Sequence, residues 1–491
     1  MNALKKRTWL RIGIGILLGF LLVRLVARAW ISDDAFITLR VIDNFVHGFG
    51  LRWNVVERVQ VFTHPLWLFL LTPFYFLTRE AYFTTLSVSF LTSCAALALV
   101  LRKLISRDFA KIFVLALLFF SHAFLDFATS GLENPLTNLL FALFVFIFFQ
   151  KDSPRKLLAL SFVAALATVN RLDTILLFVP VLLWEFFAAP HKAKAFGQIL
   201  LGYTPLILWE FFALIYFGFP FPNTFYAKLA TGIAPLALLA QGGKYLIDSF
   251  IRDPLTLATI FAAFVWSLVS RSKKLLGLAA GLCLYLIYIL KIGGDFMSGR
   301  FLAPLFFGSV ILLGQIPDLV QLKKFAKIIL LFAVVGWGIN FSGSPIAAKT
   351  INDFGIADER EFFESENSLF AMIRLGGIEN HSWAPKNQGE CHGIRSFANV
   401  GIYGFLAPRD CVIIDEYALT DAFLARLPAT PNWRIGHFAR ELPTDYLDSL
   451  SQNKNLLTDS QLQKLFTQIQ TITRGPIWSV GRWQAIRELN F

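Results

Sequence analysis

The feature that most constrains this chain is a series of apolar segments long enough, or nearly so, to cross a membrane. They lie at residues 12–30, 80–101, 109–128, 133–149, 156–169, 172–189, 195–217, 254–270, 275–292, 300–317 and 326–344. A helix rises 1.5 Å per residue, so about 20 apolar residues cross a hydrocarbon core of roughly 30 Å. A chain of 491 residues with 56% hydrophobic residues cannot bury this much apolar surface in one soluble core. The sequence therefore predicts an integral membrane protein with about 11 spans.

Two apolar segments need a closer interpretation. The first, at 12–30, is too long for the apolar part of a signal peptide and no small-residue cleavage pattern follows it. We expect it to remain in the chain as a membrane anchor. A further run, Pro65 to Leu77, is short for a crossing, and counting it as a span would place the basic residues near 102–111 outside. We therefore expect it to be juxtamembrane or re-entrant.

The positive charges indicate the orientation of the chain. Lysine and arginine gather in the connections 102–111, 151–156, 191–194, 271–274 and 323–327. By the positive-inside rule these connections are cytoplasmic, which also places the N-terminus in the cytoplasm. The basic residues of these cytoplasmic connections explain the net charge of +12, and we predict no nucleic-acid partner. The longer loops and the part of the chain after residue 341 fall on the outer side of a plasma (inner) membrane.

Two adjacent carboxylates stand where the first span ends, in I-S-D-D-A-F-I-T-L-R at residues 31–40. One explanation is structural, because Ser32, Asp33 or Asp34 could cap a helix from Ala35 to His47. The other is functional. Ionisable groups at the ends of membrane helices usually face a water-filled cavity or pair with one another, and most of the expected outer loops carry such groups.

The acidic pair begins a motif at residues 33–67, which reads D-D-A-F-I-T-L-R-V-I-D-N-F-V-H-G-F-G-L-R-W-N-V-V-E-R-V-Q-V-F-T-H-P-L-W. Further blocks follow in order: T-S-G-L-E-N-P (129–135), N-R-L-D (170–173), F-P-N-T-F-Y-A-K (221–228), G-G-D-F-M-S-G-R-F-L-A-P (293–304), V-I-I-D-E-Y-A-L-T-D-A-F-L-A-R-L-P (412–428), R-I-G-H-F-A-R (434–440) and I-T-R-G-P (472–476). Together they resemble the GT-C glycosyltransferases, specifically the mycobacterial terminal arabinofuranosyltransferases, which use a decaprenyl-phosphate donor. The chain departs from that family in its Phe-rich, Gly-poor composition and its shorter length, which leaves the sugar open.

The resemblance implies a mainly α fold, a polytopic transmembrane helical bundle of the GT-C type with a C-terminal extracytoplasmic α+β domain. We expect residues 1–345 to form the transmembrane catalytic domain and residues 346–491 the extracytoplasmic one. In the latter the sequence predicts helices at 357–375, 418–427 and 458–471 and a buried strand at 411–415. This domain is expected either to hold a growing glycan or to use its aromatic residues as core. The residues concerned are Trp383, Trp433, Trp478 and Trp483.

The resemblance also places the catalytic function of the family on the acidic pair. Transfer of a sugar from a polyprenyl phosphate to a hydroxyl needs a carboxylate that takes the proton of the acceptor. We expect Asp33 to be this general base and Asp34 to orient or bind the acceptor, with the two roles nearly interchangeable on sequence alone. Two neighbouring carboxylates also repel, which would raise one pKa or favour a bound cation.

The remaining site residues follow from the needs of the same reaction. Cations near the leaving phosphate stabilise its charge, and we expect Arg300, Lys228 and Arg171 to supply them. The residues that we expect to contact sugar or acceptor, each of which could instead be a loop cap or a turn residue, are Glu133, Asp173, Asn223, Asp295 and His64. No metal-ligand spacing is present, so no metal and no cofactor is predicted, although a divalent cation is left open. All these groups are expected to converge in one hollow at the outer leaflet.

The sequence thus predicts a membrane glycosyltransferase that adds a sugar, arabinofuranose in the first place, to a cell-wall or surface glycan. The expected partners are a polyprenyl-phosphate sugar donor, a glycan or lipid-linked acceptor and membrane lipid. Alternatives are another sugar, such as mannose or aminoarabinose, another acceptor, such as lipid A or protein, and, from a different class, a transporter. Transporters place ionisable residues near the midplane and often show inverted repeats, whereas here the charges gather at span ends.

Overall fold

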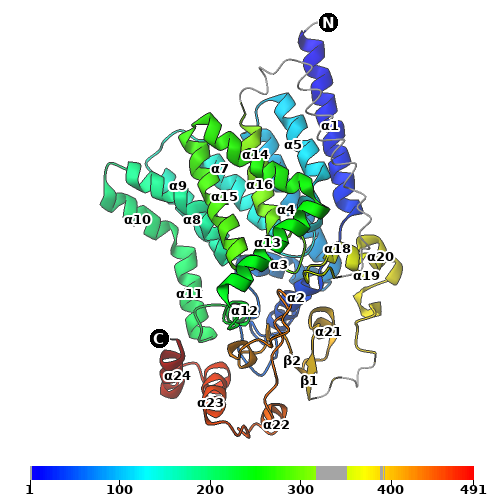
Figure 1. Cartoon of the computed structure of the whole chain (residues 1–491), viewed down its shortest axis with the longest axis vertical. Coiled ribbons are helices and arrows are strands. Elements are labelled where there is room, and N and C mark those ends of the chain that lie inside the picture. Colours follow the sequence, from blue (N-terminus) through cyan, green and yellow to red (C-terminus); the bar gives the residue numbers. More distant parts are fainter. Residues whose placement is uncertain (1–2, 317–350, 387–390, 392, 491) are drawn as a thin grey trace. The chain divides into compact units, whose positions relative to one another are not determined.

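The computed structural model describes residues 3–316, 351–386, 391 and 393–490 (Figure 1). Its first part consists of helices joined by short connections: α1 (Ala3–Ala27), α2 (Asp33–Val46), α3 (Pro65–Thr78), α4 (Tyr82–Leu99) with a π-helical turn (Val100–Leu104), α5 (Asp108–Phe120), α6 (His122–Phe127), α7 (Asn134–Phe149), α8 (Lys156–Asn170), a 3-10 turn (Leu172–Thr174), α9 (Ile175–Ala188), α10 (Lys192–Gly202), α11 (Thr204–Tyr216), α12 (Asn223–Leu229), α13 (Pro235–Arg252), α14 (Pro254–Ser270), α15 (Lys273–Lys291) and α16 (Leu302–Gly314). The predicted segments up to 300–317 all fall on these helices, while the segment 326–344 lies outside the described residues.

Within the described ranges, three helices have the length and composition to cross a membrane, namely Thr8–Ala27, Tyr82–Leu104 and Lys273–Lys291. Two pairs of helices meet the same criteria together, α10 with α11 and α13 with α14, which would give five spans. The run after His64 forms the apolar helix α3, and α7, α8 and α16 are likewise apolar but shorter than 18 residues. The number of about 11 spans stays a prediction.

The break between α13 and α14 has a chemical cause in the sequence Asp253-Pro254. Proline at the first position of α14 has no N–H to continue the preceding helix, and the Asp253 side chain accepts a hydrogen bond from the Thr256 amide at 3.2 Å. The same carboxylate accepts the Ala123 amide at 3.1 Å. The chain therefore turns by 111° at this point.

The chain divides into two compact units built from segments that are distant along the sequence. The first contains residues 1–31, 85–205 and 235–371. Its central element is α16, which is buried along nearly its whole length and contacts α5, α7, α14 and α15. A helix that is apolar on all sides is typical of a protein core or of a membrane span. Figure 1 shows α7, α14, α15 and α16 close together.

The second unit contains residues 32–84, 206–234 and 372–491. It includes a parallel pair of strands, β1 (Ile394–Phe397) and β2 (Val412–Asp415), with Ile394 opposite Val412 and Phe397 opposite Asp415. Parallel strands need a crossover, and helix α21 (Gly401–Leu406) lies within it. The predicted strand at 411–415 is thus β2. The predicted domains 1–345 and 346–491 stay a prediction.

Other elements of the C-terminal part differ from the prediction in detail. They are α18 (Glu359–Phe362), α19 (Glu364–Asn367), α20 (Leu369–Leu375), a 3-10 turn (Ile378–Asn380), a second 3-10 turn (Leu424–Arg426), α22 (Tyr446–Ser451), α23 (Ser460–Arg474) and α24 (Val480–Asn490). The single helix expected at 357–375 is therefore three short ones. The helix expected at 418–427 is wrong, because Ala418 has φ of 61° and the Asp421 carboxylate binds the amides of the following turn. The helix expected at 458–471 is present as α23, capped by Asp459.

Cys391 and Cys411 form a disulfide that closes a loop across the strand pair, with their Cα atoms 5.4 Å apart. A crosslink over 20 residues restricts the unfolded chain and contributes about 3 kcal/mol of stability. We expect Cys391→Ser to lower the unfolding temperature of the purified protein. Dithiothreitol should lower the unfolding temperature of the wild type equally and leave that of the variant unchanged. An equal dithiothreitol effect on both proteins would contradict this.

Candidate active site

The acidic pair lies at the start of α2, and the structure decides which residue caps this helix. Ser32 is the N-cap, and its hydroxyl oxygen accepts the Ala35 amide at 3.3 Å. The Asp33 carboxylate is used differently. Its Oδ1 accepts the amide of Ile402 at 2.7 Å and its Oδ2 accepts the amide of Gly401 at 3.2 Å. Since Ser32 already caps the helix, capping does not explain the presence of Asp33.

Asp33 is half-buried, and its surroundings change its acidity. The pKa of Asp33 is raised to about 7, chiefly by burial and also by the neighbouring charge of Asp34, although the two backbone hydrogen bonds act to lower it. A carboxylate with a pKa close to neutrality can both accept and release a proton at working pH. This agrees with the expectation that one member of the pair has a raised pKa.

The two amides that hold Asp33 belong to the start of α21, where side-chain size matters. A Cβ atom on Gly401 would lie 2.5 Å from the Asp33 carboxyl carbon and still closer to the Asp33 backbone oxygen. Glycine therefore permits the close approach of α21 to α2. The other end of α21 is fixed by the buried Arg40, whose guanidinium donates to the carbonyl oxygens of Gly404 and Ala407.

Gly401→Ala is expected to displace the Gly401 and Ile402 amides from Asp33 and to reduce the rate of the expected sugar transfer at least tenfold. Hydrogen bonds to the charged form lower a carboxyl pKa, so weakening them raises the pKa of Asp33 and moves the midpoint of the pH–rate profile to higher pH. The control is Gly481→Ala in α24, where nothing lies within 4 Å of the added carbon. An unchanged pH midpoint in Gly401→Ala would contradict the positioning role.

His64 lies near the acidic end of α2. Its Nε2 is 2.8 Å from the hydroxyl of Thr38, which stands one helical turn after Asp34 on the same face. The imidazole is buried at the start of α3.

Lys228 stands in the last turn of α12 and belongs to a positively charged group. The pKa of His437 is lowered to about 3, chiefly by burial and also by the positive charges of Arg434 and Lys228. The imidazole is therefore neutral at physiological pH, while two cations lie close enough to act on it. Arg434 and His437 belong to the R-I-G-H-F-A-R block, and their association with Lys228 was not predicted.

Asn223, expected to contact sugar, has a structural position. Its amide nitrogen donates to the carbonyl oxygens of Ala418, Leu419 and Asp421 at 2.9 to 3.1 Å. The side chain thus fixes the turn that replaces the expected helix at 418–427.

The other expected residues meet in the first unit, where three loops contribute to one ion cluster. Arg171 donates to Glu133 at 2.7 Å and forms a two-pronged contact with Asp173, with a shortest distance of 2.8 Å. Its guanidinium carbon lies 4.2 Å from the centroid of the Phe301 ring. Because a guanidinium presents five donors in a fixed plane, these contacts hold both carboxylates in one orientation.

Arg300 belongs to the same cluster but is held less tightly. Its distances to Asp295 and Glu133 are 3.4 Å and 3.5 Å, compared with 2.7 Å and 2.8 Å for Arg171. Arg300, Asp295 and Glu133 are all buried.

The structure therefore gathers the predicted residues in two groups. Asp33, Asp34, His64 and Lys228 lie in the second unit with Asn223, and the three-loop cluster lies in the first. The expectation that both groups face a single hollow stays a prediction. Within the described part of the chain, no group of three or more His, Cys, Asp or Glu side chains could hold a metal ion.

Known proteins with similar sequences include two terminal beta-(1->2)-arabinofuranosyltransferases. That of Mycobacterium tuberculosis is 24% identical over 515 residues, covering 84% of this chain and 80% of the relative. That of Corynebacterium glutamicum is 25% identical over 505 residues, covering 84% and 73%. No family model matches the chain.

Among solved structures, ArnT from Cupriavidus metallidurans in the apo state matches with a TM-score of 0.55 and 12% identity, over 85% of this chain and 87% of that one. The chain has the GT-C fold. The predicted resemblance to GT-C glycosyltransferases, the mainly α membrane fold and the assignment as a glycosyltransferase are confirmed. A second structure of ArnT, bound to undecaprenyl phosphate, matches with a TM-score of 0.44 and 14% identity, over 70% of this chain and 66% of that one.

Sequence patterns located the acidic pair in this GT-C protein but not the residues that hold it. Gly401 and Ile402 act through their backbone amides, so their side chains give no chemical signal. The R-I-G-H-F-A-R block contained a signal for the residues associated with Lys228, because it carries two arginines and a histidine in seven residues.

Proposed function

We propose that this chain transfers arabinofuranose from a polyprenyl-phosphate donor to a hydroxyl of a cell-wall or surface glycan on the outer side of the membrane. The observation that carries the proposal is the half-buried Asp33 with its pKa near 7, in a chain whose relatives are named as arabinofuranosyltransferases. The N-terminus would be cytoplasmic, as the distribution of basic residues predicts.

In the proposed reaction, the acceptor hydroxyl oxygen attacks the anomeric carbon of the donor sugar. The bond between that carbon and the phosphate oxygen breaks, and its electron pair leaves with the polyprenyl phosphate. Asp33 takes the hydroxyl proton and thereby raises the nucleophilicity of the oxygen. Asp34 orients the acceptor from the next position of the same helix.

The phosphate gains negative charge as it leaves, and fixed cations stabilise that charge more in the transition state than in the ground state. Lys228, supported by Arg434, is the candidate in the second unit, since both charges already act on the same imidazole. In the first unit Arg300 has the longer ion pairs and is the better phosphate candidate. Arg171 would act by positioning Glu133 and Asp173 for sugar hydroxyls.

The test is a transfer assay with the purified full chain, a synthetic polyprenyl-phosphoryl arabinofuranose and an arabinofuranoside acceptor. We expect a product that is one pentose heavier by mass spectrometry. Donors carrying mannose or aminoarabinose on the same lipid are run in parallel. Faster turnover with one of these would overturn the choice of sugar, and no turnover with any lipid donor would overturn the transferase proposal.

A further inference from the structure

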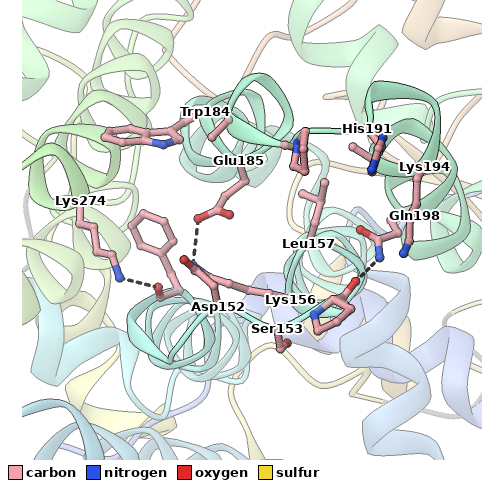
Figure 2. Close-up of a pocket in the computed structure, with 16 residues that line it drawn as sticks. Asp152, Ser153, Lys156, Leu157, Trp184, Glu185, His191, Lys194, Gln198 and Lys274 are labelled. Carbon is pink, nitrogen blue, oxygen red and sulfur yellow. Dashed lines mark hydrogen bonds and ion pairs between the residues drawn. The ribbon is translucent and has the colours of Figure 1, made fainter.

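A cavity of about 510 Å³ lies in the first unit, apart from the ion cluster of the three loops. Its wall is formed by the connection between α7 and α8, the connection between α9 and α10, and the start of α15, as Figure 2 shows. Gln198 of α10 donates to the Pro154 carbonyl oxygen and joins two of these segments. The volume falls within the roughly 300–1,000 Å³ that is usual for small-molecule sites.

Charged side chains line this cavity. Lys156 is buried and paired with Asp152 at 2.9 Å and Glu185 at 3.0 Å, so its charge is compensated. Lys274 and Lys194 differ, because the described residues provide neither with a carboxylate partner within ion-pair distance. The Lys274 ammonium donates to the Phe148 carbonyl oxygen at 3.3 Å. Three lysines and two carboxylates line the cavity, so its cationic groups are in excess.

The aromatic ring of Phe148 forms part of the cavity lining. The ammonium groups of Lys156 and Lys274 lie 5.3 Å and 5.5 Å from the centroid of the same Phe148 ring. Two cations are thus held near one ring, and of the two Lys156 is the one with ion pairs at 2.9 Å and 3.0 Å. An anion in the cavity would meet the second without displacing an existing ion pair.

The helices around the cavity expose large apolar side chains. These are Leu183 and Phe187 on α9 and Phe196, Leu200 and Leu201 on α10, between 49% and 69% exposed. A soluble anion would gain nothing from such surroundings, whereas an amphiphile uses both the cationic cavity and the apolar helix surface. Basic pockets between membrane helices bind anionic lipid headgroups in this manner.

We propose that this cavity binds the phosphate headgroup of an anionic phospholipid, with Lys274 and Lys194 as its cationic contacts. The acyl chains would lie against α9 and α10. By the predicted orientation, the lipid belongs to the cytoplasmic leaflet, opposite the leaflet where transfer is expected. The site is therefore separate from the donor site.

Native mass spectrometry of the full chain in detergent tests this, with short-chain phosphatidylglycerol, phosphatidylcholine of equal chain length and inorganic phosphate as probes. We expect phosphatidylglycerol to bind more tightly than phosphatidylcholine. Each cation near a lipid surface is worth about a fivefold change in affinity, so Lys274→Gln with Lys194→Gln should weaken phosphatidylglycerol binding about 25-fold. Lys103→Gln, in another basic connection, is the matched control and should change nothing.

A second variant, Ala188→Trp, fills the cavity without changing its charge and should also abolish the preference for phosphatidylglycerol. An undiminished preference in both the double lysine variant and Ala188→Trp would overturn the proposal. Inorganic phosphate that competes as strongly as the lipid would overturn the lipid as the source of the phosphate. Unfolding temperatures of all variants identify those that have lost their fold.

Discussion

Asp33→Asn is expected to lower the rate of sugar transfer by about 10² to 10⁴-fold, the usual contribution of a general base. Asparagine has nearly the same shape and can still accept a hydrogen bond from the Ile402 amide, but it cannot take the proton of the acceptor. The fold should persist because Ser32 caps α2. The measurement is the single-turnover rate with saturating donor and acceptor, together with the unfolding temperature.

Asp34→Asn is the matched variant at the neighbouring position, and it too should lose most activity, through the acceptor rather than through proton transfer. Removing the Asp34 charge lowers the pKa of Asp33, since that charge raises it. The midpoint of the pH–rate profile should therefore move to lower pH in Asp34→Asn. Wild-type rates in both variants would contradict the catalytic assignment.

Lys228→Gln is expected to reduce kcat/KM by about 10² to 10³-fold, because a fixed charge that stabilises the leaving phosphate is lost. The loss should fall mainly on kcat if Lys228 acts on the developing charge, and mainly on KM if it only binds the donor. The same substitution should raise the pKa of His437, because the positive charge of Lys228 lowers it. An NMR titration of that imidazole measures this second effect.

The control for Lys228→Gln is Lys464→Gln, an exposed lysine of α23 in the same unit. It removes the same charge from the protein without touching the cationic group of Lys228 and Arg434. Equal losses of activity in the two variants would mean that overall charge, and not the position of Lys228, determines the effect.

The apolar helices at the expected segments were predictable, because long apolar runs indicate their own secondary structure, whereas α12 and α13 lie in a stretch that was expected to be a loop. The start of α2 was predictable as well, from a serine and two aspartates directly after a span. The contact between Asp33 and Gly401 was not, since it joins positions 368 residues apart through backbone atoms. Patterns within the sequence carry no information about such a pairing.

The errors had local causes of the same kind. Residues 418–427 have a helical composition, but the carboxylates of Asp415 and Asp421 bind the backbone amides of the turns that follow them. The expectation that Arg171 binds phosphate stays a prediction, and in the structure its donors contact two carboxylates of its own cluster. In each case the residue type indicated the charge of the side chain, whereas the group that the side chain contacts depended on the tertiary structure.

The most direct test of the central claim, that a carboxylate held at the start of α2 takes the acceptor proton, is the pH dependence of kcat/KM. A base works only when deprotonated, so kcat/KM should rise about tenfold per pH unit up to the pKa of Asp33, about 7, and level off above it. Asp415 also has a pKa raised by burial to about 7, and Asp415→Asn should keep the profile. A wild-type profile that is flat between pH 5 and pH 9, on the order of two units either side of neutrality, would contradict the account.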